Sequence, residues 1–493
     1  MLRRAAQLET NARRASARFT TWRLAIFAVG LFGSIIPHKL GWTLLGNATL
    51  AFSFMLFLIV AWHHNRLEDR LHRLRRWQGI KQVHLARMRL GWADIPFRPV
   101  PVPERHGYAT DLDLAGPHSL LHLINNTVSS QGQERLASWL FDQPPEPAQW
   151  AVRQALIREL TPLSLLRDRL SLEAQAVEDA DIDGRRLLAV LQKRVDSPSF
   201  MPMLLTETFL ALATAGLMLT DLVYGIGNYW MLSFGLYAFL FLSVRSRSEE
   251  IFDHAQSLHR QLERLSAVIG YQERRSYRAA PRLAELCRPL LQQDTSPSTS
   301  LKQAASVMNR LSVRAHPLVH YLINAFGPWD LYHTYRLQHL QDRIAAVAPQ
   351  WFELLAELDA AASLATFAYL HPDYPWPSLQ QPDDAAHLNG AGPILDAQGL
   401  AHPLIPAKAR VANHIVFQER GRMFLVTGSN MSGKSTFLRT IGINTCLAQA
   451  GGPVCAASFR WSLVRIGSCL PVDDSLDGGL SFFLCRGETA QEN

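Results

Sequence analysis

Four apolar runs, arranged as two closely spaced pairs, restrict the folds open to this chain of 493 residues. The first pair covers about 20–36 and 41–62, and the second covers about 203–224 and 229–244. Runs of this length can cross a hydrocarbon core of about 30 Å as helices, because a helix satisfies its backbone hydrogen bonds internally. We therefore predict two transmembrane helical hairpins. Burial of each pair inside a helical domain is the alternative.

Basic residues flank the hairpins, whereas the tips between the paired runs carry little charge. By the positive-inside rule, both termini and the segment between the hairpins are cytoplasmic. The sequence thus predicts a multi-pass protein of the inner (cytoplasmic) membrane, held by four helices, with its soluble domains in the cytoplasm. Glu207 lies about one turn from the cytoplasmic end of its run, so we expect its carboxylate to reach the interface. The flanking basic residues are Arg3, Arg4, Arg13, Arg14, Arg18, Lys193, Arg194, Arg245 and Arg247.

Composition narrows the class of protein further. Charged residues make up 18% of the chain and hydrophobic residues 48%, against about 25% charged in a typical soluble protein. The five cysteines form no CxxC pair, and their odd number argues against a disulfide framework, so a reducing compartment suits them. The net charge of +7 fits a polyanionic partner, either nucleic acid or anionic lipid, but the arginine-rich cytoplasmic flanks of a membrane protein give the same sign, so net charge alone does not decide between them.

Proline-rich breaks and changes in apolar periodicity divide the sequence into six parts. The whole is predicted to be multidomain and mainly α, with a C-terminal α/β domain whose apolar runs HIVF and RMFLVTG have the pattern of strands. The predicted parts are a tail with the first hairpin (1–76), a basic juxtamembrane helix with packed helices (77–192), the second hairpin (193–248), long helices that return on each other (249–370), a linker (371–393) and the α/β domain (394–493).

The α/β domain contains a phosphate-binding loop between an apolar run and an apolar-periodic helix, in the stretch MFLVTGSNMSGKSTFLRTIG. The spacing Gly428-x4-Gly433-Lys434-Ser435 lets backbone N–H groups curl round phosphate at a helix N-terminus. Lys434 is expected to reach the β- and γ-phosphates of ATP, and the Ser435 hydroxyl to ligate Mg²⁺. The predicted nucleotide-binding residues are Gly428, Ser429, Asn430, Met431, Ser432, Gly433, Lys434, Ser435 and Thr436.

Hydrolysis needs one more group than binding does. A P-loop ATPase also uses an acidic residue at the end of a second apolar strand to hold Mg²⁺. No apolar run ending in Asp-Glu follows Ser435 in this sequence. We therefore expect the chain to bind ATP and Mg²⁺ without turning ATP over, and the sequence assigns no catalytic residue.

Several separate stretches resemble the MutS-type DNA mismatch-repair ATPases, in particular their membrane-anchored relatives. TGSNMSGKSTFLR is similar to that family's P-loop, in which an Asn and a Met precede the second glycine, as Asn430 and Met431 do here. HPLIPAKARVANHIVF, from His402, resembles the family's entry strand, and LAELDAAASLATFA, from Leu355, resembles the helix that returns from the lever arms to the core. NNTVSSQGQERLASWLFDQPPEPAQWAVRQALIREL, from Asn125, resembles a core segment.

A further stretch, DDSLDGGLSFF from Asp473, resembles the family's signature loop. The resemblance implies that Ser481 acts in trans, facing the γ-phosphate held by the other subunit of a dimer, with Phe483 packed behind it. Two features depart from the family pattern. A membrane hairpin stands where a mismatch-reading domain is expected, and Arg486 stands where a Glu is expected. We expect a C-terminally truncated, incomplete P-loop ATPase domain of the ABC type.

The resemblance implies a membrane-anchored, MutS-like protein that forms a homodimer, binds ATP between its subunits and couples this to lever movement around DNA. Two other classes stay open: an ABC-type transporter ATPase, and a non-enzymatic membrane scaffold that uses nucleotide as a latch. No Leu-Ser-Gly-Gly-Gln-like signature follows the loop, which disfavours the transporter. An effect of DNA on nucleotide binding would favour the MutS-like protein, whereas an effect of a lipid or solute would favour the transporter.

Overall fold

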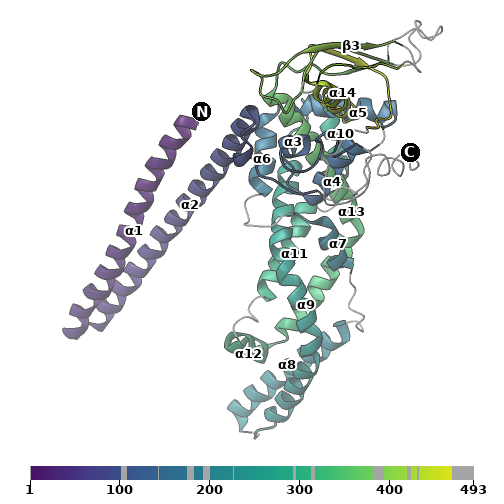
Figure 1. Cartoon of the computed structure of the whole chain (residues 1–493). Helices are drawn as coiled ribbons and strands as arrows, with labels where there is room; N and C mark the ends of the chain where they lie inside the picture. The colour runs from purple at the N-terminus through teal and green to yellow at the C-terminus, as the bar shows by residue number, and fades with distance from the viewer. Residues whose placement is uncertain are drawn as a thin grey trace, which may run out of the picture. The chain divides into compact units, whose positions relative to one another are not determined.

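The computed structural model describes residues 2–100, 108–142, 144–174, 182–192, 200–225, 227–292, 296–311, 317–380, 394–418, 423–429 and 432–468. These residues form two compact units, Met1–Pro96 and Phe97–Asn493. The described part is mainly helical with one small mixed sheet, which confirms the predicted fold class at that level (Figure 1).

The first unit is a long helical hairpin of α1 (Leu2–Lys39) and α2 (Thr43–Arg89), followed by the short η1 (Trp92–Asp94). Its helices approach closely at Gly30, where an added Cβ atom would lie 2.4 Å from the Cβ of Ser53. Polar contacts join the helices further toward the N-terminus, where Arg75 Nε donates to Glu9 Oε1 at 3.0 Å. The helices thus extend well beyond the predicted apolar runs, which form only part of the hairpin.

Among the described residues, three helical stretches could cross a membrane by length and composition: Gln7–Pro37, Thr43–Arg89 and Met201–Tyr224. The fourth predicted run is a shorter apolar stretch, Trp230–Ser243, at the start of a long helix. Three of the four predicted membrane helices are therefore candidates by this measure.

The second unit is built round α13 (Trp329–Leu370), whose alanine-rich second half lets neighbouring helices pack closely. Figure 1 shows the α8–α9 hairpin at the opposite end of this helical body from the sheet. The other helices are α3 (Leu120–Ile124), α4 (Ser130–Phe141), α5 (Pro147–Leu160), α6 (Ser164–Ala174), α7 (Gly184–Gln192), α8 (Phe200–Tyr224), α9 (Trp230–Glu273), α10 (Pro281–Leu291), α11 (Pro297–Leu311) and α12 (Pro317–Phe326).

Glu207, on α8, is covered by other parts of the chain, whereas the sequence predicts that its carboxylate extends freely to the membrane interface. Its side chain is buried, and Asp330 on α13 lies close enough to act on it electrostatically. Leu331 packs against Met203 and Leu204 on the same part of α8. The start of α13 therefore covers Glu207, a tertiary contact that no local pattern in the sequence indicates.

The sheet has four strands in the order β1-β4-β2-β3 and lies beside α14 (Lys434–Gln449). β2 is antiparallel to both β3 and β4, whereas β1 and β4 are parallel. The predicted HIVF strand is confirmed as β3. The strands are β1 (Ser378–Leu379), β2 (Leu395–Leu400), β3 (Asn413–Phe417) and β4 (Ser458–Trp461).

The second predicted strand, RMFLVTG, is wrong for the residues that the structure describes. Residues 423–429 form no strand, and Met423 and Leu425 are 93% and 85% exposed. An apolar strand of an α/β sheet is stable when neighbouring strands satisfy its backbone and helices cover its faces. Among the described strands none pairs with residues 423–429, so apolar periodicity alone does not make this segment a strand.

Candidate functional site

The predicted phosphate-binding loop leads into α14 and contains two glycines in different surroundings. Gly433, the residue before the helix, has a φ of +85°, a left-handed conformation that favours glycine. Gly428 begins the loop, and a Cβ atom added to it would lie 2.8 Å from Ser432 Oγ. The backbone angle at Gly433 therefore favours glycine, whereas a side chain at Gly428 would displace only the Ser432 hydroxyl.

Lys434, the first residue of α14, directs its ammonium group into the curve of this loop. Its Nζ donates to the carbonyl oxygens of Gly428 and Ser429, at 2.7 and 2.6 Å. An ammonium group held between two carbonyls beside a helix N-terminus lies where a phosphate is also favoured. Phosphate oxygens would compete with the two carbonyls for its protons.

Most of the predicted nucleotide-binding residues lie together at this turn. The structure brings Gly428, Ser429 and Ser432 close to the first turn of α14, where Ser435 and Thr436 are exposed. Asn430 and Met431 lie outside the described residues, as does Ser481, which the resemblance places in trans. An exposed serine hydroxyl in the first turn of a helix suits the proposed Mg²⁺ ligand at Ser435.

The middle of α14 is held by Asn444, whose side chain is completely buried. Its Nδ2 donates to the carbonyls of Ala401 and Thr440 at 3.0 and 2.8 Å, and its Oδ1 accepts from Cys455 N at 2.7 Å. Asn444 thus joins the loop helix to two loops beside the sheet. Sequence analysis missed this residue because its partners are distant in the chain.

The end of α14 is fastened to the helical body. Trp150 on α5 donates its indole N–H to the carbonyl of Ala448 at 2.7 Å. Gly452, just after the helix, lies close to α13, since a Cβ atom there would be 3.1 Å from a methyl group of Leu364. A displacement of α14 would therefore be passed to α5 and α13.

A cluster around Arg410 orders the loop between β2 and β3. Its guanidinium donates to Tyr374 Oη at 2.6 Å and to the carbonyl of Pro403 at 3.2 Å. Burial lowers the pKa of the neighbouring His402 to about 4, with Arg439 and Arg410 adding to this effect. His402 is therefore neutral at pH 7 and acts as a packed, hydrogen-bonding side chain.

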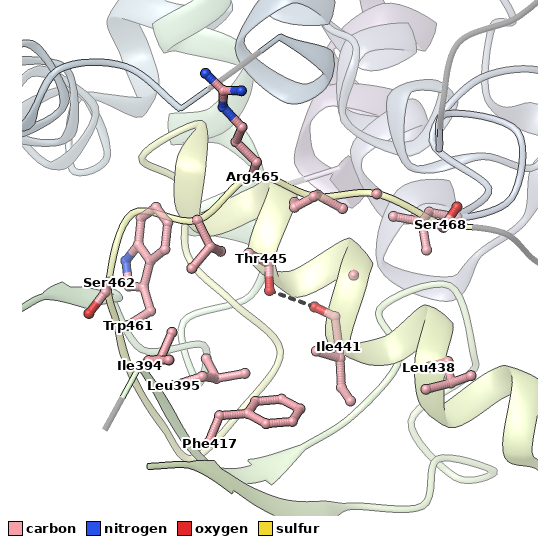
Figure 2. Close-up of a pocket in the computed structure, with 15 residues that line it drawn as sticks. Ile394, Leu395, Phe417, Leu438, Ile441, Thr445, Trp461, Ser462, Arg465 and Ser468 are labelled. Carbon is pink, nitrogen blue, oxygen red and sulfur yellow. Dashed lines mark hydrogen bonds between the residues drawn. The ribbon is translucent and has the colours of Figure 1, made fainter. Parts of the chain in front are cut away.

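An apolar cavity of about 510 Å³ lies between α14 and the sheet (Figure 2). Leu438 and Ile441 line it from the helix, and Phe417 and Trp461 line it from the strands. The Thr445 hydroxyl, also at its wall, already donates to the carbonyl of Ile441 at 2.8 Å. None of the described residues of the loop lines this cavity, so it is separate from the proposed phosphate site.

Comparison with known proteins gives the same assignment as the loop. Residues 424–491 match the family model described as MutS domain V. Part of the chain is thus similar to the MutS-type mismatch-repair family. The DNA mismatch repair protein MutS of Chlorobium chlorochromatii is 38% identical over 133 residues, which are 27% of this chain and 14% of that protein.

Two other MutS proteins show a similar match. That of Lactobacillus delbrueckii subsp. bulgaricus is 32% identical over 31% of this chain and 18% of its own length. That of Desulfovibrio desulfuricans is 34% identical over 30% of this chain and 15% of its own length. The MutS-like chain thus spans less than a fifth of the length of these relatives.

Proposed function

We propose that this MutS-like chain is a membrane-anchored protein that binds ATP and Mg²⁺ at the loop Gly428–Thr436 and uses them to change its conformation as a homodimer on DNA. The observation that carries the proposal is the placement of Lys434 Nζ in a glycine loop at the N-terminus of α14. DNA as partner is supported by the names of the relatives, each a DNA mismatch repair protein.

The residues of the loop fit a magnesium nucleotide. Gly428 and Gly433 let the backbone approach phosphate, Lys434 supplies a positive charge, and Ser435 supplies an exposed hydroxyl for the metal. Bound Mg²⁺ neutralises phosphate charge and orients the nucleotide. The chain's own contribution is to hold the phosphates against α14, whose far end is bonded to α5 through Trp150.

Membrane anchoring is supported by α1, α2 and α8, which are long and apolar enough to cross a bilayer. Their apolar side chains are largely exposed, as expected of surfaces that face lipid. We propose that the protein resides in the inner membrane, with the loop and α14 in the cytoplasm. An alkaline carbonate wash of membranes should leave the full chain in the pellet, and its release would contradict this anchoring.

Substitution of Lys434 tests the nucleotide site. In the full chain in nanodiscs, Lys434→Ala should weaken binding of a fluorescent ATP analogue by about ten- to hundredfold, since hydrogen bonds to charged groups contribute about 1.5–3 kcal/mol. Lys408→Ala is the matched control, because Lys408 is an exposed lysine of the same region. Equal binding by both variants would contradict the assignment.

The partner is tested in the same preparation. Duplex DNA should change the affinity for the ATP analogue, because ligands that favour the same conformation bind cooperatively. A response to lipid or to a solute without any response to DNA would favour a transporter instead.

A further inference from the structure

Helix α12 has two unlike faces. His320 and Asn324, which are four residues apart, are buried against the rest of the unit. Val319, Leu322 and Phe326 form a stripe on the opposite side and are 46%, 62% and 85% exposed. A helix on a water-facing surface normally has a polar outer face. The outer face of α12 is apolar instead.

The buried face of α12 packs at the level of the candidate membrane hairpin α8–α9. Tyr237 Oη, within the apolar stretch Trp230–Ser243 of α9, donates to the carbonyl of Asn324. The ring of His320 contacts the ring of Phe241 in the same stretch, with centroids 6.0 Å apart. The exposed face of α12 therefore continues the apolar surface of that hairpin.

Among the described residues of α12 and the first turns of α13, none places a full charge on the surface. Between Pro317 and Tyr335 the one residue that carries a full charge is Asp330, which is buried and bonded to His320 at 2.6 Å. Basic side chains appear just beyond, at Arg310 and Arg336, which lie close enough to His333 to act on it electrostatically. An uncharged surface bordered by arginines matches the boundary between acyl chains and anionic headgroups.

An apolar groove of about 590 Å³ separates the start of α8 from the turn between α12 and α13. Leu205 and Thr208 line it from α8, and Phe326, Trp329 and Tyr332 line it from the other side. Tryptophan and tyrosine rings are favoured at the level where a membrane meets water. The groove opens beside Met201–Tyr224, which is a candidate membrane span.

We propose that α12 and the turn after it lie in the membrane interface and that the groove holds an acyl chain of a bilayer lipid. The inference rests on the proposed anchoring through α8 and deepens it. It makes the first turns of α13 a lipid-contacting element, so that a single helix connects the bilayer with the helices beside the ATP loop.

Photo-crosslinking from single positions tests this proposal. Benzoyl-phenylalanine is placed at Phe326, at exposed Leu219 in the second half of α8, or at exposed Asp342 on α13. The full chain is studied in vesicles of phosphatidylethanolamine and phosphatidylglycerol. Asp342 lies about 20 Å along α13 from Trp329, by the rise of 1.5 Å per residue. Each site is exposed, so the replacements should leave the fold intact.

We expect a lipid adduct at 326 and 219 and none at 342, with fragmentation placing the bond at 326 on an acyl carbon. If a lipid adduct forms at 219 but position 326 gives no adduct or a protein adduct, the inference is overturned. The proposed membrane anchoring through α8 is then still supported. Headgroup-only adducts at 326 would also overturn it. No lipid adduct at 219 or 326 would overturn both the inference and the anchoring.

Discussion

At the scale of single residues, Asp359 makes the connection between the long helix α13 and the start of α4. Its Oδ2 accepts from the backbone N–H groups of Val128 and Ser129, and from the hydroxyl of Ser129, which also caps α4. An added Cβ atom at Gly132 would lie 2.4 Å from the Cβ of Asp359, so only glycine fits there. Burial raises the pKa of Asp359 to about 7, although the hydrogen bonds from Ser129 and Val128 oppose the rise.

This pKa predicts how stability depends on pH. The folded carboxyl keeps its proton up to about pH 7, whereas the unfolded one loses it near pH 4, so between these values the folded state binds more protons. The contribution of Asp359 to stability should therefore decrease as pH rises from about 4 to 7, by up to about 1.4 kcal/mol per pH unit.

Asp359→Asn should make the free energy of unfolding less dependent on pH. The measurement is urea unfolding of the full chain in detergent, monitored by the circular dichroism of its helices. Asp342→Asn, an exposed change on the same helix, is the control and should leave the slope unchanged. An unaltered slope in Asp359→Asn would show that the carboxyl is ionised in the folded protein.

At the scale of secondary structure elements, close packing of α1 on α2 depends on a single small residue. Gly30 faces Ser53, whereas nothing lies within 4 Å of a Cβ atom added to Gly33. Both glycines lie inside α1 and have the same intrinsic effect on the helix. The two positions differ in their surroundings, because position 30 faces α2 and position 33 faces open space.

Gly30→Leu should therefore destabilise the hairpin by about 1–3 kcal/mol, since overpacking forces the helices apart. Gly33→Leu is the matched control and should be neutral or stabilising. Thermal unfolding of the purified chain in one detergent measures both, and equal behaviour of the two variants would contradict the described α1–α2 interface.

At the scale of the second unit, α13 joins the proposed lipid contact to the helices beside the proposed ATP-binding loop. Its 42 residues span about 63 Å, from Trp329 to Leu370. Asp330 and Leu331 contact elements of the α8 and α12 end, and Leu364 lies against Gly452 just after α14. A rigid element with a functional contact at each end can couple the two sites energetically.

The bond from Trp150 to Ala448 tests that coupling. ATP should alter hydrogen exchange at the start of α13 in the wild-type protein, and Trp150→Phe should reduce this change. ATP affinity should stay within about fivefold, because the ring still packs and only one hydrogen bond, about 1 kcal/mol, is lost. Trp461→Phe is the control: its ring contacts that of Trp150, and its buried indole N–H has no hydrogen-bond partner in the described part of the chain. Identical exchange in all three proteins would exclude this route.

The sequence alone determined features that depend on neighbouring residues. The apolar runs predicted α1, α2 and α8 because helical backbone hydrogen bonding is local, and HIVF predicted β3 through its β-branched and aromatic residues. The spacing of Gly428, Gly433 and Lys434 predicted a loop that leads into α14, because the left-handed backbone at Gly433 is a local requirement.

Only the tertiary structure decided features whose partners are distant in the chain. Glu207 is buried because the start of α13, more than 100 residues later, covers it. Residues 423–429 form no strand because none of the described strands pairs with them, whatever their apolar pattern. The sequence of α12 does not show which of its sides is exposed. Its packing on α9 leaves an apolar face uncovered. Burial and pairing depend on which surfaces meet in space, and local sequence patterns carry no such information.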